Sequence, residues 1–380
     1  MNQKIKIGSY ETSCLVLNMI SYKIILMYPR NIAEIAGNAG WMITILGAFL
    51  VLILFLIQNK LYKKFSGQDI LDVSEKALGE PGRIITGLLL ISYFLIIVSV
   101  ILREFVEDFK VISLSTTPTS FITILFCVGM IIGAYLGLES IARIHALVVP
   151  VIAIAFLLVL ALSIPKFDID NLTPWLGLGP KKIFENDAFH FISSYSEIIV
   201  LFLIVPFLKK KNEFGTIGRY SLIACGFILL VGTLSYMLTY QYPISTEYFL
   251  PLYTLSRSIR FSRFFTRIES AFILIWASSA FLFLSSCLYF VVYLFQKAFG
   301  LKYKKPLILP FAVLIFTFSM IPESLSVTIQ IQTEFYRKYA WILTILLPII
   351  LLSIASARNK SAKNKEIKLN DKKKISLNKN

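Results

Sequence analysis

Glu197 is an acidic residue inside a long apolar stretch of the chain. It lies ten residues after Asp187, which is about 15 Å along a helix at about 1.5 Å per residue, and so near the middle of a segment that crosses a bilayer. An ionisable side chain at that depth needs a partner or water. Two roles are open: a site for a ligand's ammonium group or a coupled proton, or a neutral or paired glutamate that holds helices together.

A run of hydroxyl-bearing residues, Ser193, Ser194, Tyr195 and Ser196, comes directly before Glu197. Their hydroxyls can bond backbone groups that an interrupted helix releases. The alternative is that small residues here let two helices pack closely. Because the run coincides with an interrupted apolar segment, we expect it to line a ligand site.

Lys23 is a basic residue inside a second apolar stretch, with four residues between it and the exit of that stretch at Tyr28 and Pro29. In one interpretation its long side chain extends to the outer headgroups. In the other its ammonium points inward, where it pairs with Glu197 or takes the place of a coupling cation. The sequence leaves both open.

Metal, cofactor and enzyme chemistry lack the residues they need. His145 and His190 are isolated, and the four cysteines each lie in an apolar run, where packing is their expected role. There is no HExxH motif, no glycine-rich phosphate loop and no Ser/His/Asp set that the apolar segments would assemble. We therefore expect no metal site, no cofactor and no enzymatic activity.

The composition is that of a polytopic membrane protein. Of the 380 residues, 57% are hydrophobic and 16% are charged, and the mean hydropathy is +0.74, whereas a soluble chain is about 45–50% apolar and about 25% charged. Repeated uncharged stretches of about 20 residues, enough to cross a bilayer as helix, also exclude a cleaved secretory signal before a soluble enzyme. We predict ten spans: 12–27, 41–59, 84–102, 119–138, 146–165, 188–208, 220–240, 270–296, 306–322 and 339–357.

The first and sixth spans are the two that an ionisable residue interrupts, Lys23 and Glu197 respectively. Interrupted segments at corresponding places in two five-span halves indicate an inverted repeat, with the binding site near the bilayer midplane between them. The sequence thus predicts an all-α membrane protein of ten transmembrane helices in a five-plus-five repeat. Breaks are expected near residues 21–23 and 193–197.

The distribution of Lys and Arg predicts that both termini are cytoplasmic. With the N-terminus inside, cytoplasmic segments hold 25 of these residues and external segments hold 12. The external group of Arg257, Arg260, Arg263 and Arg267 runs against this bias. Residues 1–357 form the membrane domain, and the polybasic tail 358–380 is expected to be disordered and to contact anionic lipid. No motif for nucleic acid accompanies the charge.

Three stretches resemble the spore germination permeases, the B subunits of nutrient germinant receptors. They are GLESIARIHALVVP at 137–150, LIVPFLKKKNE at 203–213 and LYTLSRSIRFSRFFTRIESAFILIW at 252–276. The resemblance implies the LeuT-like fold of the amino acid/polyamine/organocation superfamily. It also implies a location in the spore inner membrane, an amino-acid-type germinant, and two sister subunits, one membrane-embedded and one a lipoprotein.

The resulting hypothesis is a sensor that binds its ligand between spans one, three, six and eight; the alternative is a secondary amino acid permease coupled to protons or sodium. For three candidate residues a packing role is the alternative: Tyr93 as a packed aromatic residue, and Ser278 and Ser279 as small residues that let helices pack. The candidate ligand-binding residues are Asn18, Ser21, Tyr22, Lys23, Tyr93, Ser193, Ser194, Tyr195, Ser196, Glu197, Ser278 and Ser279.

The first span departs from the superfamily pattern. Relatives place glycines where the helix unwinds, but residues 18–23 read Asn-Met-Ile-Ser-Tyr-Lys. A wide break suited to transport is less expected with this sequence, and a fixed sensor site is equally compatible with it.

Charged residues outside these two spans are assigned mainly structural roles. Residues 60–83 predict a cytoplasmic amphipathic helix with Ser66 as its cap. Glu139 and Arg143 share helix-turn spacing and form a structural pair or part of an inner gate. Two groups are expected as ion pairs at the outer headgroups: Arg103, Glu104, Glu107 and Asp108 at the end of span three, and Arg267 with Glu269 at the start of span eight.

Overall fold

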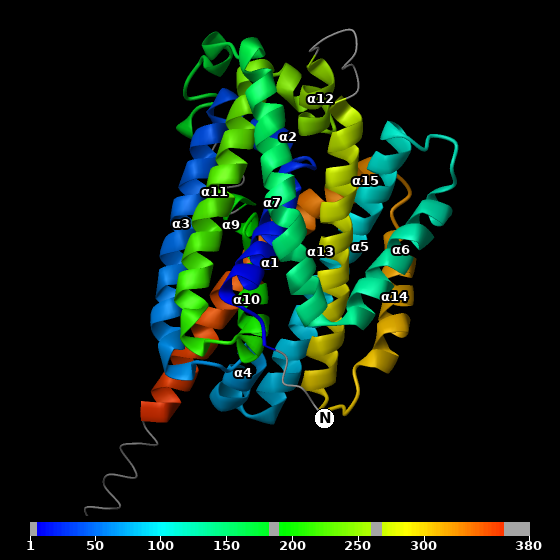
Figure 1. Ribbon diagram of the computed structural model, residues 1–380. Helices are drawn as coiled ribbons and strands as arrows, with labels where there is room; N and C mark the ends of the chain where they lie inside the picture. Colours follow the sequence, from blue (N-terminus) through cyan, green and yellow to red (C-terminus); the bar gives the residue numbers. More distant parts are fainter. Residues whose placement is uncertain (1–5, 182–189, 260–267, 361–380) are drawn as a thin grey trace, which may run out of the picture.

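The computed structural model describes residues 6–181, 190–259 and 268–360 as an almost entirely helical bundle (Figure 1). Among these residues the only extended pairing is an isolated bridge between Ile7 and Leu208. The predicted pair of Arg267 with Glu269 and nearly all of the predicted tail lie outside the part whose side chains are described.

The first half of the chain holds six main helices, of which the first two lie on either side of a break. They are α1 (Ser9–Ser21), α2 (Tyr28–Ala36), α3 (Gly40–Tyr62), α5 (Glu80–Ile112), α6 (Thr119–Leu136) and α7 (Leu138–Ser163), with the short α4 (Ile70–Leu78) between α3 and α5.

The second half repeats a short, interrupted start followed by long helices. It contains α9 (His190–Ser193), α10 (Ile199–Ile204), α11 (Phe214–Thr239), α12 (Pro251–Ser258), α13 (Ile268–Ala298), α14 (Lys305–Ser319), α15 (Leu325–Ile331) and α16 (Lys338–Trp341). After α15 the same helical rod runs on to Lys360 and includes two π-helical stretches, Gln332–Arg337 and Ile342–Leu346.

Seven described helices are long and apolar enough to cross a membrane, and two shorter apolar helices, Ser196–Phe207 and Lys305–Ser319, accompany them. These nine elements overlap predicted spans two to ten, whereas span one coincides with α1 and the 3₁₀ turn that follows it. Several elements are longer than predicted. Span three reaches Ile112 and the last span begins at Leu325, because charged residues at their ends lie against protein as well as at the surface. The chain is therefore a multi-pass membrane protein.

The helix breaks occur where they were predicted. In span one, α1 ends at Ser21, a 3₁₀ turn covers Tyr22–Ile24, and α2 begins at Tyr28. In span six, α9 ends at Ser193 and another 3₁₀ turn, Ser196–Ile198, precedes α10. The break in span one consists of the 3₁₀ turn Tyr22–Ile24 and the turn residues 25–27, and no described non-glycine residue has a positive φ.

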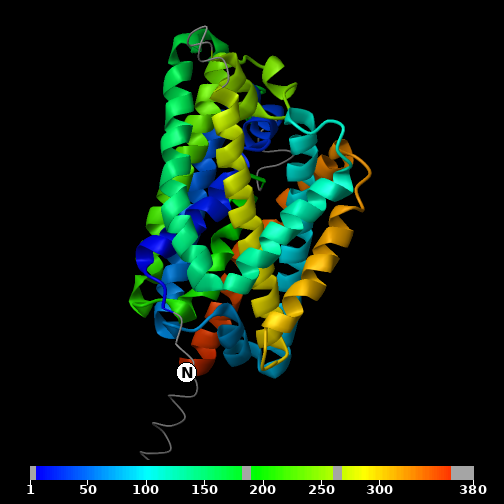
Figure 2. The ribbon, with the colours of Figure 1, turned by 45° about the vertical axis from the view of Figure 1, so that its right-hand side comes forward.

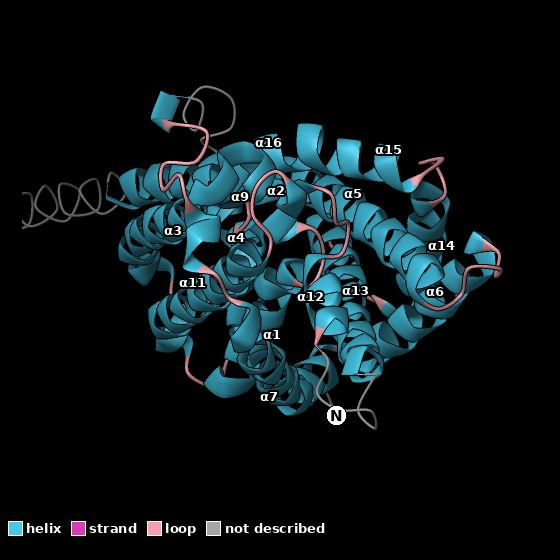
Figure 3. Ribbon diagram, turned by 90° about the horizontal axis from the view of Figure 1, so that it is seen from above, coloured by secondary structure: helices cyan, strands magenta, loops and turns pink. Residues whose placement is uncertain are grey.

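The two interrupted spans lie in the interior of the bundle. Helix α1 contacts α7, α11, α13 and the 3₁₀ turn of span six. Seen from above, α3 and α11 form one flank and α6 and α14 the opposite one (Figure 3). The described ends of the chain, at the start of α1 and the end of the last rod, lie at the same end of the molecule (Figures 1 and 2).

The short helix α4 covers that end, as the amphipathic pattern predicted, but its cap differs. Asp69, not Ser66, begins it, through a capping box in which Asp69 and Asp72 bond each other's backbone N–H groups. Lys297 of α13 lies 2.6 Å from Asp69 and 2.7 Å from Asp72. The Ser66 hydroxyl instead bonds the Lys211 carbonyl and the Asn212 side chain.

Candidate functional site

Lys23 and Glu197 form a direct ion pair at the meeting point of the two breaks. The Nζ atom of Lys23 lies 2.7 Å from Oε2 of Glu197. Glu197 is fully buried and Lys23 is 8% exposed. Of the two interpretations of Lys23, the structure therefore supports the inward one.

The same Lys23 ammonium also binds a backbone carbonyl at the break in span six. Lys23 Nζ donates to the backbone carbonyl of Ser194 at 2.6 Å, and it lies 5.5 Å from the centre of the Tyr22 ring. A carbonyl released by an interrupted helix needs a donor in a place without water. Lys23 supplies that donor from the other interrupted span, so the two breaks complete each other.

The second carboxylate oxygen of Glu197 is held by span ten. The Tyr336 hydroxyl donates to Glu197 Oε1 at 2.8 Å, and the hydroxyls of Tyr336 and Tyr93 lie 3.0 Å apart. Both tyrosines are buried. Spans one, three, six and ten therefore meet in one hydrogen-bonded chain, Lys23–Glu197–Tyr336–Tyr93.

The polar run before Glu197 is divided among several neighbours. Ser193 Oγ accepts from the backbone N–H of Trp341 at 3.3 Å. Tyr195 is fully buried, and its hydroxyl has no hydrogen-bond partner within the described part of the chain. Ser196 is fully buried beside Glu197. The run therefore lies inside the protein, as a ligand-lining role requires.

A second polar cluster joins spans one, five and eight. Ser279 Oγ donates to Asn18 Oδ1 at 2.7 Å, and Asn18 Nδ2 lies 3.3 Å from the carbonyl of Ser279 and 3.4 Å from Nε2 of His145. His145 is fully buried and its Nδ1 lies 2.8 Å from the Ile141 carbonyl. These contacts hold α1 to α7 and α13.

The remaining candidates lie on the side of span one that faces this second cluster. Ser21, Tyr22, Asn18 and Ser279 contribute to a cavity of about 30 Å³, which has room for water but not for an amino acid. The Tyr22 ring packs on Phe283 with centroids 4.1 Å apart. Ser278 is partly exposed and is not among the residues that line this cavity. The structure thus divides eleven of the twelve candidates between two neighbouring polar centres, and Ser278 lies outside the residues that it places in either.

Tyr336 and His145 are the site residues that the sequence did not single out. The predicted last span began at 339 because Glu334 and Arg337 flank Tyr336, and a search for uncharged stretches discards such a segment. His145 was considered only as a metal ligand. A polar residue at the edge of an apolar run was the available signal in both cases.

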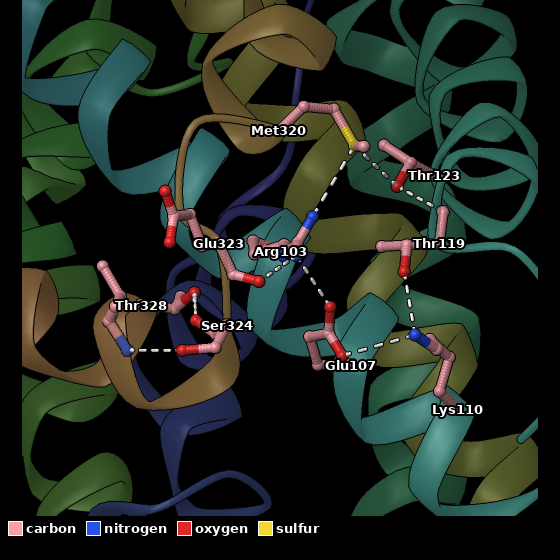
Figure 4. Close-up of polar contacts among 10 residues, drawn as sticks. Arg103, Glu107, Lys110, Thr119, Thr123, Met320, Glu323, Ser324 and Thr328 are labelled. Carbon is pink, nitrogen blue, oxygen red and sulfur yellow. Dashed lines mark hydrogen bonds and ion pairs between the residues drawn. The ribbon is translucent and has the colours of Figure 1, made fainter.

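The charged group at the end of span three differs from the expectation of headgroup ion pairs. Arg103 and Glu107 do pair, at 2.9 Å, and Arg103 also lies against the loop that carries Met320 and Glu323 (Figure 4). Glu104 and Asp108, however, are each only 1% exposed, and Glu104 accepts from Gln332 at 3.0 Å. Because α5 continues to Ile112 and packs on α13, α14 and α15, these carboxyls face protein.

The Glu139–Arg143 pair is present, at 2.5 Å. Both side chains are exposed, with Arg143 70% accessible. A pair so open to solvent contributes little to stability, and the described structure gives it no contact across to another helix.

Comparison with known proteins places this geometry in a family. The model of the spore germination protein family, Spore_permease, matches residues 6–328. Spore germination protein A2 of Bacillus subtilis is 27% identical over 95% of this chain and 99% of its own length. Spore germination protein YndE of the same organism is also 27% identical, over 94% of this chain and 98% of its own.

Solved transporters share the fold at low sequence identity. MhsT in complex with L-phenylalanine has a TM-score of 0.63 at 14% identity, covering 94% of this chain and 93% of its own. A Na⁺-coupled sialic acid symporter has a TM-score of 0.64 at 12% identity, covering 91% of this chain and 79% of its own. The paired helix breaks and these likenesses agree with the LeuT-like fold that was predicted. The chain belongs to the spore germination protein family.

Proposed function

We propose that the protein is the nutrient-sensing subunit of a spore germinant receptor and that its ligand is an amino acid. The ligand binds between spans one, three, six and eight, with span ten added through Tyr336. The observation that carries the proposal is the Lys23–Glu197 pair, which joins the two helix breaks in a buried place. Charged groups inside a membrane protein are costly and are typical of functional sites.

Two likenesses support this function. The relatives that match over nearly their whole length are spore germination proteins, and the solved structure of MhsT, with the same fold, is a complex with L-phenylalanine. The buried hydroxyl of Tyr195, without a partner in the described residues, adds a polar group that a ligand or water would satisfy.

The test is genetic. Spores that lack this protein should lose the response to at least one amino acid and still germinate by another route. Re-introducing the natural chain should restore that response. An unchanged response to every amino acid, in spores whose other germinant receptors are also deleted, would contradict the proposal.

A secondary amino acid permease is the second candidate, because the fold neighbours are transporters. The glycine-free breaks and the direct Lys23–Glu197 pair across them favour the sensor. Uptake of labelled amino acid into vesicles that contain the purified protein distinguishes the two: binding without uptake supports the sensor, and gradient-driven uptake supports the permease.

The proposal includes the surroundings of the protein. We expect the spore inner membrane as its location, two sister subunits (one membrane-embedded, one a lipoprotein) as partners, and both termini in the cytoplasm. The described chain ends lie at the same end of the bundle, consistent with an even number of crossings (Figures 1 and 2). Cysteine labelling of the tail checks the topology: labelling from the outer side would refute it.

A further inference from the structure

Lys23 places a primary ammonium group in a site built to hold one. Its Nζ atom is bound by two acceptors of span six, the Ser194 carbonyl at 2.6 Å and Glu197 Oε2 at 2.7 Å. The face of the Tyr22 ring lies on a further side, at 5.5 Å. A carboxylate, a released carbonyl and an aromatic face are groups that bind ammonium ions. The lysine is therefore an occupant that the chain itself supplies.

From this geometry we propose that a zwitterionic amino acid binds by inserting between Lys23 and Glu197. The ligand's ammonium takes the two acceptors that Lys23 now holds, and its carboxylate pairs with the displaced Lys23 ammonium. This inference rests on the proposed function and adds how the ligand is recognised.

Charge balance in a buried place selects this class of ligand. An uncompensated charge in a low-dielectric interior is very costly. A zwitterion replaces one ion pair by two and leaves no charge unpaired. A primary amine alone would leave Lys23 without its anion, and a carboxylate alone would place two anions around one cation.

Insertion also explains how binding reaches the rest of the fold. Lys23 belongs to span one, whereas Ser194 and Glu197 belong to span six, and their atoms are now in direct contact. A ligand between them must move the two breaks apart. Glu197 remains attached to span ten through Tyr336, and α1 remains attached to span eight through Asn18 and Ser279. Ligand binding is thereby coupled to a change in the spacing of spans one and six.

The first test uses the purified full chain in detergent and measures its thermal stability. Three probe mixtures are compared: the protein amino acids, the primary amines that correspond to them without the carboxylate, and the carboxylic acids that correspond to them without the amine. Ligands that bind only the folded state raise its melting temperature with concentration. We expect the amino acids alone to do so. Equal stabilisation by the amines or by the acids would overturn the proposal.

Charge-removing variants provide a reciprocal test. Lys23→Met should gain binding of the amines, and Glu197→Gln should gain binding of the acids, while each loses affinity for the amino acids by at least about tenfold. The double variant should prefer neither. Unchanged amino acid preference in either single variant would overturn the proposal, and if both singles fail to fold the natural chain's preference among the three mixtures decides.

These outcomes are separable from a failure of the proposed function. Zwitterion-selective binding by a protein whose deletion changes no germination response would contradict the receptor and keep the recognition mechanism. Amine binding equal to amino acid binding, together with a lost germination response, would do the reverse. No stabilisation by any mixture would contradict both.

Discussion

Two ion pairs in this molecule use similar residues in very different places. Lys23 and Glu197 are 174 residues apart in the chain, lie on two interrupted spans and are buried together. Arg103 and Glu107 are one turn apart on α5, near the end of the helix, where Lys110 approaches within 3.9 Å of Glu107 (Figure 4). The first pair joins two separate interrupted spans of a membrane fold, whereas the second lies within one helix and beside its neighbouring loop. Charge type alone does not reveal which role a pair has; the connection between elements does.

Removing one member of the buried pair should have the largest effect. Lys23→Met leaves the buried Glu197 with the Tyr336 hydroxyl as its hydrogen-bond donor, and breaking a buried pair in this way costs about 3–5 kcal/mol. Denaturant unfolding of the natural and variant proteins in detergent measures the change in the free energy of unfolding.

The matched control is the double variant Lys23→Met with Glu197→Gln. It removes both charges, so it should lose clearly less stability than Lys23→Met alone. A double variant that is less stable than Lys23→Met alone would show that Lys23 and Glu197 do not stabilise the fold as a pair.

The tyrosines of spans three and ten should have intermediate effects. Tyr336→Phe removes a hydrogen bond to a charged group, worth about 1.5–3 kcal/mol, together with the bond to the Tyr93 hydroxyl. Tyr93→Phe removes only that bond between two hydroxyls, worth about 1 kcal/mol. Unfolding measurements on both variants should give that order. The reverse order would mean that the Tyr93 hydroxyl makes a further stabilising interaction besides its bond with the Tyr336 hydroxyl.

The outer pair should have the smallest effect. The Arg103 and Glu107 side chains are 7% and 15% exposed, and glutamine in Glu107→Gln keeps a hydrogen-bond acceptor for Arg103. One-turn pairs on exposed helix surfaces contribute about 0.3–1 kcal/mol. We expect a loss in that range that shrinks as salt is raised, because partly exposed charges are screened. A loss as large as that of Lys23→Met would remove the contrast between the two regions.

The sequence predicted the helical membrane fold, the helix breaks and the two residues of the buried pair, because hydropathy and interrupted runs follow local composition. It left open whether Lys23 and Glu197 touch, since that depends on packing between distant segments. It missed Tyr336 because the charged residues Glu334 and Arg337 excluded the first part of the last helix from the search for uncharged stretches. It placed Glu104 and Asp108 at the surface because charge was taken as a sign of exposure, and packing of α5 overrides that rule.

The most direct test of the central claim is the germination dose-response of spores that carry Glu197→Gln, with Glu107→Gln as the matched control and protein abundance measured in both. Glutamine keeps the shape and much of the hydrogen bonding but removes the charge. If Glu197 binds the ligand's ammonium, the concentration for half-maximal response should rise about 10- to 150-fold at normal abundance, and the control should be unchanged. Normal sensitivity at normal abundance would contradict the ligand role, and loss of the protein itself would favour a structural one.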